Sequence, residues 1–124
     1  MPDLDTHPNA VAERYLALWN EADDTRRRDL LTHSWAPDAT YVDPLMDGAT
    51  HEGIAAMIEA ARGQFPGHGF TLRGTPDGHG PYVRFAWTLA PDGGAPIAEG
   101  TDVVRLDAAG RIAEVVGFLD GAVQ

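Results

Sequence analysis

The most unusual carboxylate in the sequence belongs to Asp102. The segment from Ile97 to Leu106 alternates with a period of two, and a β-strand places alternate side chains on opposite faces. Asp102 therefore shares a face with Val104 and Leu106, and we expect it to point toward the interior. A buried carboxylate is costly unless it is paired, hydrogen-bonded or neutral, and such groups are common at functional sites. A bulge that turns Asp102 to solvent, or backbone amides that bind it, would also explain the pattern.

Two further polar residues are expected to face the interior. Tyr15 lies on the apolar stripe of a predicted first helix, and Asp43 shares a strand face with Ala39 and Tyr41, just before a proline. A tyrosine and two carboxylates in one pocket can carry out proton transfer. An ionised carboxylate accepts a proton, whereas a phenol and a protonated carboxyl group donate hydrogen bonds to a developing oxyanion.

The elements that must position these residues can be read from periodicity and turn signals. A first helix is predicted from Asn9, its proposed N-cap, and a second short helix is predicted to begin at Asp23–Thr25 and to end before Pro37. The remaining elements are a strand at 38–44, a turn at 47–48, a helix at 51–64, a strand at 70–73, a turn at 75–80, and strands at 81–90, 95–107 and 111–120. This order predicts a single α+β domain over residues 9–121 with antiparallel strands, preceded by a flexible tail at 1–8.

Composition limits the classes of function. The 124 residues include 9 basic and 19 acidic side chains, for a net charge of −10, and all the basic ones are arginine. The absence of lysine excludes a Schiff-base lysine and a P-loop, and the acidic balance argues against nucleic acid and an anionic membrane as partners. The run Arg26–Arg28 is interpreted as the solvated side of a short helix.

Neither a cofactor nor a metal is expected. The chain has no cysteine, and its five histidines show no metal-ligand spacing. No apolar run approaches a membrane span, and the acidic N-terminus lacks the features of a signal peptide, so we expect a cytoplasmic protein.

The order αα-β-α-ββββ, together with four segments, resembles the nuclear transport factor 2-like superfamily, which includes ketosteroid isomerase and the SnoaL-like polyketide cyclases. The four segments are Arg14–Asn20, Trp35–Pro44, Glu52–Met57 and Gly100–Ile112. The resemblance covers about residues 9–120. It implies the ketosteroid isomerase-like or cystatin-like fold, a curved antiparallel sheet wrapped around helices into a cone with an interior cavity. It also implies a homodimer formed through the outer sheet face.

The resemblance to ketosteroid isomerase extends to three residues. Tyr15 matches its oxyanion-hole tyrosine, Asp43 its general base, and Asp102 the protonated aspartate of its oxyanion hole. The additional tyrosines that support that oxyanion hole have no match, because the third-helix position reads Ala60–Ala61.

The expected function is that of a cofactor-independent enzyme that removes a proton alpha to a carbonyl of an apolar small molecule, as an isomerase or an aldol-type cyclase. The alternative is a non-catalytic ligand-binding or dimeric structural module of the same fold. Outward-facing Thr88, Val103 and Val116 also favour a homodimer. The residues expected to form the walls of the substrate cavity are Trp19, Trp35, His51, Met57, Phe85, Trp87 and Phe118.

Overall fold

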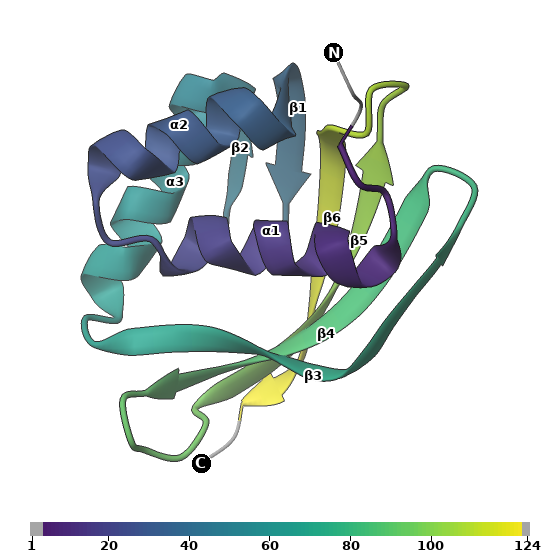
Figure 1. Cartoon of the computed structure of the whole chain (residues 1–124). Helices are drawn as coiled ribbons and strands as arrows, with labels where there is room; N and C mark the ends of the chain where they lie inside the picture. Colours follow the sequence, from purple (N-terminus) through teal and green to yellow (C-terminus); the bar gives the residue numbers. More distant parts are fainter. Residues whose placement is uncertain (1–3, 123–124) are drawn as a thin grey trace.

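Three helices and a six-stranded sheet make up the computed structural model, which describes residues 4–122 (Figure 1). The first three residues of the predicted tail lie outside this range. The helices are α1 (Pro8–Asn20), α2 (Asp24–Ser34) and α3 (Thr50–Gln64). The strands are β1 (Trp35–Val42), β2 (Asp47–Ala49), β3 (His68–His79), β4 (Tyr82–Pro91), β5 (Ala98–Leu106) and β6 (Ile112–Ala122). The predicted α+β class is confirmed.

The sheet is curved, unclosed and mixed, with the strand order β2-β1-β6-β5-β4-β3. The expectation of purely antiparallel strands is wrong at one place, because β1 pairs with β6 in parallel, with Tyr41 opposite Val115. Parallel neighbours require a long crossover connection, and all the elements between β1 and β6 provide it. The pairing places the end of β1, and with it Asp43, beside the centre of β6.

Three boundaries differ from the prediction for local reasons. The segment interpreted as a turn at 47–48 forms β2, because the chain folds back after Asp43 and pairs Val42 with Asp47. The predicted turn at 75–80 is part of a long β3, whose register shifts between Arg73 and Asp77. Helix α1 begins at Pro8 rather than after Asn9, because proline suits the first helical position.

Helix α2 confirms one prediction and corrects another. The side chain of Asp23 caps it by accepting a hydrogen bond from the Arg26 backbone N–H at 2.9 Å. Arg27, however, is only 3% exposed instead of solvated. Its Nη1 donates to the Glu21 carbonyl at 2.7 Å, and its Nη2 donates to Asp24 at 3.2 Å, so a backbone carbonyl and a carboxylate compensate for its burial.

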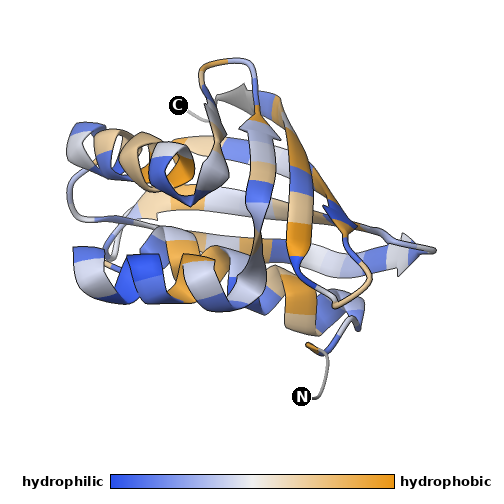
Figure 2. Cartoon of the chain, turned by 90° about the horizontal axis from the view of Figure 1, so that it is seen from above, coloured by the Kyte–Doolittle hydropathy of each residue, from blue (hydrophilic) through white to orange (hydrophobic). Residues whose placement is uncertain are grey.

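The core lies between the three helices and the sheet that curves around them (Figure 1). Hydrophobic and hydrophilic stretches alternate along both helices and strands, as the helical and strand periods require (Figure 2). The stripe of α1 is buried as predicted, with Tyr15 and Trp19 facing the sheet. Helix α1 packs on β3 and β4, and α3 packs on β1 and β2. None of the helices in the described range is long and apolar enough to cross a membrane.

Candidate functional site

A pocket of about 260 Å³ opens between the ends of α1 and α3 and the concave face of the sheet. Tyr15, Asp43 and Asp102, which the sequence analysis singled out, all line it. The wall is otherwise mostly apolar. Its other members are Leu16, Trp19, Tyr41, Leu45, Met46, Ala61, Arg62, Phe65, His68, Phe70, Trp87, Leu89, Ala98 and Leu119.

Asp102 occupies the centre of β5, opposite Phe85 on β4 and Gly117 on β6, and is 2% exposed. The Tyr15 hydroxyl donates a hydrogen bond of 2.5 Å to its Oδ2. The alternative in which Asp102 turns to solvent is therefore wrong, and a side chain from α1 binds it instead of the backbone amides considered above. The strand period thus placed this carboxylate correctly.

Burial raises the pKa of Asp102 to about 6. The hydrogen bonds from Tyr15 and Trp87 oppose this shift in the pKa, whereas the neighbouring charges of Asp43 and Asp120 add to it. Burial, followed by the charge of Asp102, also raises the pKa of Tyr15 well above its ordinary value. Tyr15 is therefore a neutral hydrogen-bond donor, while Asp102 exchanges its proton close to neutral pH.

Asp43 has a different environment, because hydrogen bonds occupy both of its oxygens. The Tyr41 hydroxyl donates to Oδ2 at 2.5 Å, and the backbone N–H groups of Leu45 and Met46 donate to Oδ1 at 2.7 and 2.9 Å. These bonds hold the turn that leads from β1 into β2. The sequence analysis did not assign a role to Tyr41, although its position two residues before Asp43 on one strand face indicates their contact.

Gly117 leaves room for three polar side chains of the site to lie close together. A Cβ atom at this position would lie 2.8 Å from Asp102 Oδ1, 3.1 Å from Asp43 Cβ and 3.6 Å from the Tyr41 hydroxyl. Asp102, Asp43 and Tyr41 therefore all approach the backbone of Gly117. A glycine inside a strand often marks such a close approach, and this was the available sequence signal.

Aromatic rings form much of the apolar wall. Trp87 crosses directly over Gly100, where any Cβ atom would collide with its indole ring, and Phe70 packs edge-on against Trp87 with ring centroids 5.1 Å apart. Of the seven residues expected to form the cavity walls, Trp19 and Trp87 line the pocket. The hydrophobic side chains of Leu45 and Leu119 are exposed at its edge.

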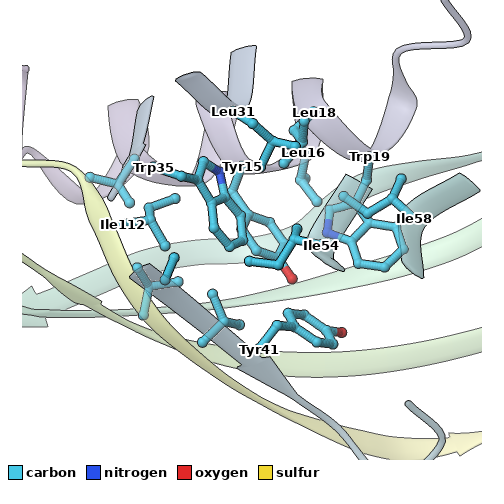
Figure 3. Packing of buried hydrophobic residues seen from close by; sticks show 14 of the residues in the cluster. Tyr15, Leu16, Leu18, Trp19, Leu31, Trp35, Tyr41, Ile54, Ile58 and Ile112 are labelled. Carbon is cyan, nitrogen blue, oxygen red and sulfur yellow. The ribbon is translucent and has the colours of Figure 1, made fainter. Parts of the chain in front are cut away.

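Three of the other expected wall residues belong to the core instead. Trp35, Met57 and Phe85 are buried and do not line the pocket, since neighbouring side chains cover them. Trp35 stacks on Tyr15 with ring centroids 6.0 Å apart (Figure 3). Phe85 packs edge-on against Tyr15 with ring centroids 4.9 Å apart. Both rings therefore pack against Tyr15 in the core, outside the pocket.

The last two expected wall residues also lie away from the pocket. His51 Nε2 donates to the Trp35 backbone carbonyl at 2.9 Å, which ties the start of α3 to β1. Phe118 is 53% exposed and pairs with Thr101 across β5 and β6, on the outer face of the sheet.

Two basic side chains that the sequence did not indicate line the pocket. Arg62 Nη1 donates to the Trp19 carbonyl at 2.7 Å, which joins the ends of α3 and α1. His68 Nδ1 donates to the Pro66 carbonyl at 3.0 Å, which leaves Nε2 as the acceptor nitrogen when the ring is neutral. Within residues 4–122, no cluster of three or more histidine, aspartate or glutamate side chains is arranged to hold a metal ion.

Comparison with solved structures finds the same architecture. A proposed isomerase of the SnoaL-like family from Agrobacterium tumefaciens strain C58 is 56% identical, with a TM-score of 0.91, covering 94% of this chain and all of the other. A proposed SnoaL-like polyketide cyclase from Jannaschia sp. CCS1 is 17% identical over 97% of this chain and 92% of the other, with a TM-score of 0.70.

A protein with a ketosteroid isomerase-like fold from Catenulispora acidiphila, in complex with trimethylamine, is 16% identical over 90% of this chain and 85% of its own, with a TM-score of 0.71. The similarities to the Jannaschia and Catenulispora structures, at 17% and 16% identity, show a shared fold and nothing more. A comparison with curated protein sequences finds no match. The family model of the SnoaL-like domain matches residues 12–115. The chain therefore belongs to the SnoaL-like domain family.

Proposed function

We propose that the protein is a cofactor-independent enzyme that moves a proton at the carbon alpha to a carbonyl group of a small apolar substrate. The observation that carries this proposal is Asp102, a carboxylate with a pKa of about 6 in an apolar pocket, hydrogen-bonded to Tyr15. A general base works best when its pKa lies near the operating pH. The 56% identical relative, itself a proposed isomerase, supports the same reaction class.

Hydrogen bonding favours Asp102 over Asp43 as the proton acceptor. An ionised carboxylate offers about four lone-pair positions. Asp43 uses three of them for Tyr41, Leu45 and Met46, whereas Asp102 accepts from two donors, Tyr15 and Trp87, and its Oδ1 lies beside Gly117. We therefore assign the base to Asp102, in place of the Asp43 assignment that the resemblance to ketosteroid isomerase implies.

The proposed step transfers negative charge from Asp102 to the substrate. Asp102 takes the alpha proton, and the electron pair of the broken C–H bond moves onto the carbonyl oxygen to form an enolate. The Tyr15 hydroxyl then donates to the enolate oxygen, because Asp102 is neutral and accepts less strongly. Return of the proton to another carbon shifts a double bond. Attack of the enolate carbon on a second carbonyl carbon instead closes a ring, and the alkoxide that forms takes the proton back from Asp102.

The size of the pocket restricts the substrate. Its volume of about 260 Å³ lies just below the range of roughly 300–1,000 Å³ that is usual for drug-sized ligands. Its walls offer apolar contact except near Tyr15, Tyr41 and the two carboxylates at one place and near Arg62 and His68 at another. We therefore infer a compact apolar ketone or a short dicarbonyl compound as the substrate.

Exchange of alpha protons in heavy water, followed by NMR on a panel of small cyclic and unsaturated ketones, tests the proposal. Asp102→Asn should abolish exchange, and Asp43→Asn should retain part of it. The wild-type rate should rise with pH to a plateau above about pH 6, because only ionised Asp102 accepts a proton. If Asp102 instead acts as a protonated donor beside a basic Asp43, the rate should fall above that pH and the two variants should exchange roles.

The alternative function is a binding module of the same fold. Native mass spectrometry of the purified protein would detect a co-purified ligand, and its carbonyl content would test the substrate class. Saturable binding of ketones without exchange above the buffer rate would contradict catalysis and favour the binding module.

A further inference from the structure

We propose that Trp19 is a positioning residue whose indole N–H donates to the Tyr15 oxygen when Tyr15 donates to a negatively charged oxygen. Trp19 would then donate to Tyr15, and Tyr15 to Asp102 or the enolate oxygen, so that one chain of hydrogen bonds ends at the reacting centre. This inference rests on the proposed function, since it assigns a role to a residue beside the same site.

The first observation is an indole donor with no hydrogen-bond partner. Trp19 lines the pocket and is 5% exposed, and its Nε1 is buried without a hydrogen-bond acceptor among the described residues. A buried donor without an acceptor is destabilising, and native proteins rarely retain one. A phenylalanine ring would fill much of the same volume without this cost. Packing alone therefore does not explain a tryptophan here.

The second observation is the position of this donor relative to Tyr15. Trp19 follows Tyr15 by four residues on α1, so both side chains lie on one helix face, with ring centroids 6.5 Å apart. Figure 3 shows the indole nitrogen on the side of the ring that faces the Tyr15 hydroxyl. The nearby indole N–H favours a lower pKa of Tyr15, against the larger effect of burial, although it does not meet hydrogen-bond geometry in this structure.

The chemistry of a phenol allows both contacts at once. The Tyr15 hydroxyl has one proton, which it donates to Asp102, and its oxygen retains lone pairs that can accept. Hydrogen bonds in such a chain polarise one another, so a bond from Trp19 would make Tyr15 a stronger donor. Trp19 would thus take the place of the supporting tyrosines of ketosteroid isomerase, which have no match in the sequence.

Indole NMR tests the inference without any turnover. The chain contains three tryptophans, and Trp19→Phe and Trp35→Phe assign their ¹⁵N-indole signals. The Trp19 signal should shift with a midpoint near pH 6, following Asp102, and should stay constant in Asp102→Asn. The Trp35 signal should not move, since Trp35 stacks on the other side of Tyr15 and does not line the pocket.

The kinetic test separates positioning from packing. Trp19→Phe should lower kcat for alpha-proton exchange by up to roughly tenfold and leave KM nearly unchanged, as expected for one neutral hydrogen bond. Trp35→Phe is the matched control for ring loss next to Tyr15. A Trp19 signal that is constant from pH 5 to 8 would overturn the inference, whatever the variants do. If no ketone exchanges but the Trp19 signal still titrates with Asp102, the proposed function fails and the hydrogen-bonded chain stands.

Discussion

The two faces of the sheet at β5 and β6 hold acidic groups in opposite environments. On the outer face, half-exposed carboxylates pair with arginine: Glu114 lies 3.1 Å from Arg105, and Asp120 lies 2.6 Å from Arg73. On the inner face, Asp102 is buried and its hydrogen-bond donor is the phenol of Tyr15. Exposed ion pairs contribute little either way, whereas a buried carboxylate without a cation opposes folding. The costly carboxylate is thus the one that lies in the pocket, where a function can explain it.

The largest expected effect is the loss of the phenol on the inner face. Tyr15→Phe removes both the partner of Asp102 and the donor to the enolate, so kcat for alpha-proton exchange should fall by about 10²–10³-fold. Tyr82→Phe is the matched control, because Tyr82 is 44% exposed on β4 and does not line the pocket. Equal rates for the two variants would remove Tyr15 from the mechanism.

The second effect concerns stability and pH. The pKa of Asp102 is raised from 3.8 to about 6 on folding, so the folded state binds its proton more tightly than the unfolded chain. The free energy of unfolding of the wild type, measured relative to that of Asp102→Asn, should therefore be greatest at pH 3.8 and below. It should decrease as the pH rises through about 6. The total loss should be about 3 kcal/mol. Urea unfolding of both proteins from pH 3.5 to 8 measures this difference.

A variant on the outer face of the sheet serves as the comparison for Asp102→Asn. Glu114→Gln breaks a half-exposed pair with Arg105 and should change the free energy of unfolding by no more than about 1 kcal/mol at pH 7. If Glu114→Gln lowers the free energy of unfolding by as much as Asp102→Asn raises it, the two faces of the sheet do not differ in the way described.

The third effect probes the close packing of Asp102 and Asp43 against Gly117. Gly117→Ala would place a methyl group 2.8 Å from Asp102 Oδ1, so it should destabilise the protein by about 1–3 kcal/mol and reduce exchange. Gly63→Ala is the control, since nothing lies within 4 Å of a Cβ there and α3 should gain roughly 0.5–1 kcal/mol. Thermal unfolding of both variants gives the comparison, and a neutral Gly117→Ala would contradict the close approach.

The smallest effect on the pocket should come from changes that disrupt assembly. Val103 and Val116 pair across β5 and β6 on the outer face, with exposed Val42 and Phe118 on neighbouring strand positions. We propose a homodimer through this apolar surface. Light scattering at micromolar concentration should give twice the chain mass, and Val103→Arg should give a monomer that retains its α-proton exchange. A monomeric wild type would refute the proposal.

The elements and the inward direction of Asp102 followed from periodicity, because each depends on local sequence. The parallel pairing of β1 with β6 did not, since contacts between distant segments leave no periodic signal. Tyr15, Asp43 and Asp102 all line one pocket, and their shared inward direction could be read from the helix and strand periods. The three hydrogen bonds to Asp43 depend on a turn whose backbone direction the sequence did not indicate. The core positions of Trp35 and Phe85 could not be separated from wall positions, because both are apolar and inward-facing.

The pairing of β1 with β6 also affects how the protein is made. The β1 strand leaves the ribosome before three further strands of the sheet, β3 to β5, but its parallel partner β6 follows them all, so this part of the sheet can form only after β6 has been synthesised. Until then, the β1 edge that β6 later covers remains open to other strands. Contacts between such distant segments slow folding. The polar end of the pocket, which combines Asp43 after β1 with Gly117 of β6, is therefore assembled late in folding.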